Sequence, residues 1–139
     1  MRISLLIHKK ADFLKYNLLS MKLGIGVIVG SRKKKISWIH LDDAVHFIKE
    51  AMANKNYNGP YNLAAINPIN QEIFIKTIKE QLFPYALIIR LPFFLIKLLL
   101  GERSKIINTN QSICVDKLKK LGFIWKFPDF NMVVSSIRN

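Results

Sequence analysis

Short apolar runs of strand length recur along the chain. Residues 3–7 form such a run, which is typical of a strand buried on both faces, as in a parallel sheet. Shorter extended segments are predicted at 36–41, 61–65, 87–91 and 123–127. Helical patterns separate them, so the order of elements predicts an α/β fold.

Apolar residues at helical spacing, with capping residues beside them, predict the helices. The predicted helices cover 11–21, 42–52, 70–82, 93–100, 115–121 and 129–137. Asn70 and Asp129 are suited to cap their helices, and Pro92 and Gly101 are placed to begin and end the fourth.

The second helix has the clearest pattern. Asp42 can cap it, and Asp43 adds negative charge at the positive end of the helix dipole. Its apolar positions predict a buried stripe, which consists of Leu41, Ala44, Val45, Ile48, Ala51 and Met52.

Residues 22–35 contain three glycines and are predicted to form a loop. Gly24-Ile25-Gly26 lacks the third glycine and the following helix of a dinucleotide-binding loop. The sequence therefore offers no cofactor-binding residue.

The length of 139 residues fits one domain but is short for an enzyme with a nucleotide lobe and a substrate lobe. A single Cys excludes a disulfide scaffold and suits a reducing compartment, so we expect a cytoplasmic protein. The apolar stretch 86–101 is shorter than a bilayer requires and contains charges, so no membrane span is predicted.

The net charge of +13 raises the alternative of a small basic nucleic-acid-binding protein. The basic residues do not alternate with aromatic residues as a base-stacking surface requires. Compositional bias toward Lys, Ile and Asn is the favoured explanation, and nucleic acid is not the expected partner.

Motifs that carry chemistry are absent. No nucleotide-binding, metalloprotease or serine-hydrolase motif occurs, and no Tyr has a Lys four residues later. His40 and His46 are six residues apart and would not share a helix face, so a metal site is not expected. We predict no catalytic and no metal-binding residue.

Several segments, in order, carry a family resemblance. Ser37-Trp38-Ile39-His40-Leu41-Asp42-Asp43 resembles the S-W-I-H-x-D-D segment of epimerase-like proteins of the extended short-chain dehydrogenase/reductase superfamily. The supporting segments are 2–6, 22–26, 30–31, 59–65, 67–68, 91–93, 98–102, 118–123 and 127–128. Lys35 and Ile36 depart from the pattern, which has an aromatic residue before this segment, and Ala11-Asp12 replaces a glycine pair.

The resemblance covers the C-terminal half of that family, including its DUF1731-type region. It implies the last parallel strands of a Rossmann-type sheet over 1–66 and a helical substrate-side region over 67–139, together forming one structural unit. The nucleotide-binding half, with its glycine-rich loop and its Tyr-x-x-x-Lys position, is absent from these residues.

The same resemblance makes His40, Asp42 and Asp43 a structural motif at the floor of the active-site cleft. It places the loop before them on the substrate side, and the candidate residues there are Lys33, Lys34, Lys35, Ser37 and Trp38. The lysines could neutralise a substrate phosphate, and the alternative is a solvated basic loop.

The expected function is therefore that of a truncated or split NAD(P)-dependent epimerase-like protein that supplies the substrate-side lobe and is inactive alone. We expect no cofactor in this chain alone, NAD(P) in the full-length family, and a small-molecule or nucleotide-linked substrate. The expected partner is a separately encoded nucleotide-binding half. A non-functional structural remnant is a further alternative.

Overall fold

The computed structural model describes residues 1–29, 35–92 and 113–138. The predicted helix over 93–100, with Gly101, lies outside these ranges, as do Lys33 and Lys34. In chain order the elements are β1 (Arg2–Ile3), β2 (Leu5–Ile7), α1 (Asp12–Lys22), β3 (Ile25–Val29), β4 (Lys35–Ile36), β5 (Trp38–His40), α2 (Leu41–Ala53), β6 (Asn62–Leu63), β7 (Ile69–Asn70), α3 (Gln71–Leu82), β8 (Leu87–Leu91), α6 (Asp116–Lys120) and α7 (Phe130–Arg138).

The fold is mixed α/β with parallel strand pairs, as predicted. β1 pairs with β6, β2 with β5, and β3 with β8, all in parallel, whereas β4 and β7 are antiparallel. The predicted strand over 3–7 is confirmed, but it breaks at Ser4, where it changes partner. The Ser4 N–H donates to Leu63 O at 3.0 Å, and the Leu5 N–H donates to Ser37 O at 3.1 Å.

The prediction of a loop over 22–35 is wrong for residues 25–29, which form β3, and residues 30–34 lie outside the described ranges. Gly24 has φ of 89° and makes the turn after α1. A Cβ on Gly26 would lie 2.9 Å from Met21 Cε and 3.3 Å from Ile75 Cγ2. Because Gly26 has no side chain, α1 and α3 can pack closely against β3. This glycine therefore does not indicate a loop.

Two apolar clusters form the core. The first is centred on Trp38, Phe74 and Phe130, and the second on Phe47, Leu118 and Phe123. Both clusters contain residues from either side of position 66, so the two expected regions share both cores. The division at that position stays a prediction.

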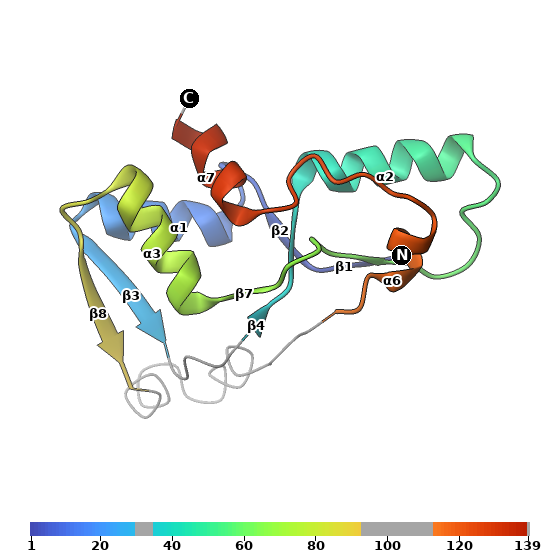
Figure 1. Cartoon of the computed structure of the whole chain (residues 1–139). Helices are drawn as coiled ribbons and strands as arrows, with labels where there is room; N and C mark the ends of the chain where they lie inside the picture. The colour runs from blue at the N-terminus through green and yellow to red at the C-terminus, as the bar shows by residue number, and fades with distance from the viewer. Residues whose placement is uncertain (30–34, 93–112, 139) are drawn as a thin grey trace.

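Figure 1 shows where the elements that contribute residues to these clusters lie. α1 and α3 lie next to the β3–β8 pair at one end, and α2 and α6 lie at the other. The prediction of one buried stripe on α2 is wrong in part, because Val45, Ile48 and Met52 are exposed. α7 packs against α3, so late residues complete the first cluster. Within the described ranges, no helix is long and apolar enough to cross a membrane.

Candidate functional site

The candidate site lies where β2 and β5 end together. The two strands are parallel and pair Ile7 with His40, so His8 and Leu41 follow at the same edge. In α/β proteins the carboxyl ends of parallel strands are the usual place for ligand sites.

His40 is the N-cap of α2, and the prediction that Asp42 caps this helix is wrong. The helix begins at Leu41, one residue earlier than predicted, so Asp42 lies within its first turn. Nδ1 of His40 instead accepts a hydrogen bond from the Asp42 N–H at 3.2 Å.

The surroundings of His40 favour the neutral form of its ring. The side chain is buried, and its ring lies 4.0 Å from the Phe127 ring between centroids. Burial lowers the pKa of His40 below 6.5, with help from His8 and Lys126, although Asp42 and Asp43 act in the opposite direction. A neutral ring retains the Nδ1 lone pair that the cap needs.

Asp43 has no exposed surface, and its hydrogen bonds join the first turn of α2 to residues 126 and 127. Its Oδ1 accepts from the Lys126 N–H at 2.6 Å, and its Oδ2 accepts from the Phe127 N–H at 3.1 Å. Asp42 instead pairs with the Lys126 ammonium at 3.1 Å on the surface. The adjacent carboxylates therefore have different contacts, one inside the fold and one at its surface.

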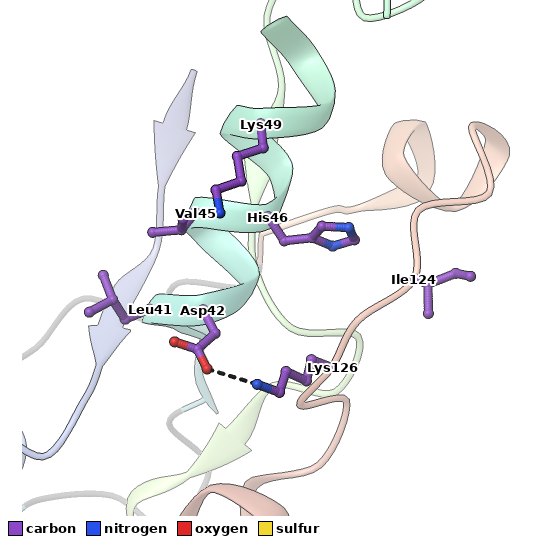
Figure 2. Close-up of a pocket in the computed structure, with 7 residues that line it drawn as sticks. All are labelled: Leu41, Asp42, Val45, His46, Lys49, Ile124 and Lys126. Carbon is purple, nitrogen blue, oxygen red and sulfur yellow. Dashed lines mark hydrogen bonds and ion pairs between the residues drawn. The ribbon is translucent and has the colours of Figure 1, made fainter. Parts of the chain in front are cut away.

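Two hollows adjoin this edge and share Asp42 and Lys126. The larger is an open groove of about 620 Å³ between the exposed side of α2 and the segment 124–126 (Figure 2). The smaller, of about 290 Å³, is lined by His8, Lys9, His40, Asp42, Lys126, Phe127, Ser136 and Ile137. Its lining combines two lysines and two histidines with the Asp42 carboxylate, which suits a polar group.

Two observations concern metal binding and proton transfer among the described residues. No group of three or more His, Cys, Asp or Glu within these ranges could hold a metal ion. Burial, followed by the 2.5 Å hydrogen bond that its hydroxyl donates to Glu50, raises the pKa of Tyr57 to about 12. This phenol stays protonated at neutral pH and cannot act as a general base.

The predicted substrate-side residues that can be placed lie before the His40 turn. The Lys35 side chain is exposed, and its backbone pairs with Asn70. Ser37 is buried, and its Oγ accepts from the Ile113 N–H at 2.9 Å. Trp38 is fully buried, and its Nε1 donates to Asn67 O at 3.1 Å. The structure therefore places Ser37 and Trp38 inside the fold.

Sequence reasoning missed His8, Lys126 and Phe127 as neighbours of the motif. One sequence feature indicated that Phe127 is important, because the Phe127-Pro128 pair belongs to the family pattern that the chain resembles. Lys126 had none, because its hydrogen bond to Asp43 joins residues 83 positions apart.

The chain is similar in sequence and structure to several known proteins. No family model matches the chain. An epimerase family protein of Staphylococcus haemolyticus is 29% identical over 137 residues, covering 98% of this chain and 45% of the relative. One from Bacillus subtilis is 31% identical over 121 residues, covering 86% of this chain and 39% of the relative.

Among solved structures, a human epimerase family protein crystallised with NADPH superposes with a TM-score of 0.86 at 20% identity. The match covers 98% of this chain and 46% of the human chain. The chain is thus homologous to epimerase family proteins, and it spans less than half the length of the relatives it matches.

Proposed function

We propose that this chain supplies the C-terminal, substrate-side part of an NAD(P)-dependent epimerase-like protein. A nucleotide-binding part that these residues do not include, supplied as a separate chain, completes the fold. The observation that carries the proposal is the match of 98% of this chain to part of a protein crystallised with NADPH. The absence of a glycine-rich cofactor loop from the sequence supports it.

In this proposal the His40–Asp43 turn forms the floor of the substrate cleft, as the family resemblance implies. Its position at the carboxyl ends of two parallel strands, where α/β proteins usually bind ligands, supports this role. Lys33, Lys34 and Lys35 belong to the substrate side and neutralise a phosphate of a small or nucleotide-linked substrate, whereas Ser37 and Trp38, which are buried, support this side from within the fold. The proposal includes a cytoplasmic location, which suits a chain with one Cys.

Co-expression tests the proposal. The probe is the portion of the Bacillus subtilis relative outside the stretch that this chain matches. We expect the two polypeptides to co-purify and to bind NADPH saturably, as measured by cofactor fluorescence. Failure to co-purify, or co-purification without NADPH binding, would contradict the proposal.

The DNA upstream of the coding sequence offers a second test of the separate partner. We expect a reading frame there that encodes a glycine-rich dinucleotide-binding loop. Its absence would favour a non-functional remnant.

A further inference from the structure

The extended segment over residues 2–7 has a described partner strand on one side. Among the described strands, β1 pairs with β6 alone and β2 pairs with β5 alone. The N–H groups of Arg2 and Ser4 donate toward β6, and that of Leu5 donates to the residue before β5. Successive residues of a strand direct their backbone groups to opposite edges, so these three bonds show which residues face a partner.

β5 and β6 lie on the same side of this segment. Because Leu5 bonds to Ser37, the backbone groups of Trp38 face away from β2. Trp38 O accepts from the Ala65 N–H, so β5 lies between β2 and the residues that follow β6. The break at Ser4 allows this arrangement, since two consecutive residues pair on one side there, as they do at a β-bulge.

The opposite side of the segment therefore carries the N–H and C=O groups of Ile3 and Leu6, and we call it the open edge. The Ile3 side chain is 48% exposed, so this end of the segment is accessible. Unpaired backbone groups along an edge strand are a template for one kind of occupant, which is another strand.

Charge disfavours a second copy of this chain as that occupant. Two identical edges pair about a two-fold axis and are therefore antiparallel. Such a pair would bring Arg2 of one copy toward His8, Lys9 and Lys10 of the other. The net charge of +13 on each copy adds to this repulsion.

The relatives contain enough additional chain to supply the strand. This chain covers 45% of the Staphylococcus haemolyticus relative and 39% of the Bacillus subtilis relative, so more than half of each lies outside the match. The nucleotide-binding part that we assign to the remainder is built from parallel strands in a Rossmann-type fold. β1 and β2 already pair in parallel with their described partners.

We propose that the nucleotide-binding part joins this chain at the open edge, through a parallel strand that pairs with the backbone of Ile3 and Leu6. This inference rests on the proposed function, because it names the edge at which the two parts form one sheet.

Proline at position 3 tests the open edge. Ile3→Pro removes the outward N–H and places a ring carbon in the path of the added strand, while Arg2 and Ser4 keep their bonds toward β6. Ile3→Ala is the matched control, because it shortens the same side chain and keeps the N–H.

The Bacillus subtilis probe is co-expressed with each variant, and the dissociation constant is measured by dilution in analytical ultracentrifugation. We expect the affinity of Ile3→Pro for the probe to be at least about tenfold lower than that of Ile3→Ala. We expect the unaltered chain without the probe to sediment as a monomer.

The outcomes separate the two proposals. If the unaltered chain binds the probe and the two variants bind equally well, the open edge is wrong and the proposed function stands. If the unaltered chain does not bind, the proposed function fails, and the open edge fails with it. A dimer of the unaltered chain that Ile3→Pro abolishes would place a second copy at the edge and overturn this inference.

Amide hydrogen exchange tests the open edge without a substitution. We expect the Ile3 amide of the unaltered chain to exchange at least about tenfold more slowly in the complex, because a backbone hydrogen bond must open before exchange. The control is the Val27 amide, which faces away from β8 on the separate β3–β8 pair and should exchange equally fast with and without the probe. An unchanged rate at Ile3 in the complex would overturn the inference.

Discussion

Asp42 and Asp43 are neighbours in sequence, yet their carboxylates contribute very differently to stability. Asp43 is fully buried and accepts two backbone N–H groups, whereas the Asp42 ion pair with Lys126 lies at the surface. Buried hydrogen bonds to a charged group are worth more than exposed ion pairs, which water and salt screen.

We expect Asp43→Asn to lower the free energy of unfolding by about 2 kcal/mol, because the amide NH₂ must face one of two buried backbone donors. Asp42→Asn should change it by less than about 1 kcal/mol. Urea unfolding of both variants measures the difference. Equal effects of the two substitutions would contradict the role given to Asp43.

His40 makes stability depend on pH. Its pKa in the folded chain is lowered from 6.5, chiefly by burial, so the unfolded chain binds more protons below that pH. The stabilisation is therefore complete above pH 6.5 and is lost as the pH falls toward the folded-state pKa.

We expect His40→Asn, which keeps a capping acceptor, to weaken the loss of stability on acidification. His46→Asn is the control, because His46 is exposed. Urea unfolding on either side of pH 6.5 gives the comparison. An unaltered pH dependence in His40→Asn would contradict a titrating cap.

Elements whose ends carry local signals could be predicted from the sequence. Asn70 caps α3 as expected, with Oδ1 accepting from the Ile73 N–H at 2.7 Å. Asp129 accepts from the Asn131 N–H at 3.0 Å in the same way. Gly122, with φ of 73°, follows α6 as expected.

What could not be predicted depends on packing between distant segments. Gly26 resembles a loop residue until α1 and α3 are seen to pack against it. Likewise, no spacing rule shows that Asp43 meets residues 126 and 127, or which side of α2 is covered. The candidate site was therefore found in part, through the His40–Asp43 motif but without Lys126.

We expect Asn70→Ala to lower the free energy of unfolding by about 1 kcal/mol, because α3 loses its side-chain cap. Asn70→Asp should retain most of that stability, since a carboxylate also accepts from the first turn. Thermal denaturation of the two variants provides the measurement. Equal losses in both would show that the cap contributes little.

For the whole molecule, the proposed function predicts that NADPH binds only when the nucleotide-binding part is also present. The sequence contains no glycine-rich phosphate loop, so the chain alone should show no saturable NADPH binding at micromolar concentration. Titration followed by NADPH fluorescence is the measurement, with the co-expressed complex as the positive control. Saturable binding by the isolated chain would contradict this prediction.

The partner exchange at Ser4 and the bonds of Asp43 also determine when folding can occur during synthesis. The first strand emerges from the ribosome long before residues 61–65, with which it pairs, and Asp43 emerges long before its donors at 126 and 127. Phe130, Val133 and Val134 then complete the first core cluster. A nascent chain therefore cannot complete the first core cluster until residue 134 has left the exit tunnel, so folding of that cluster follows synthesis of nearly the whole chain.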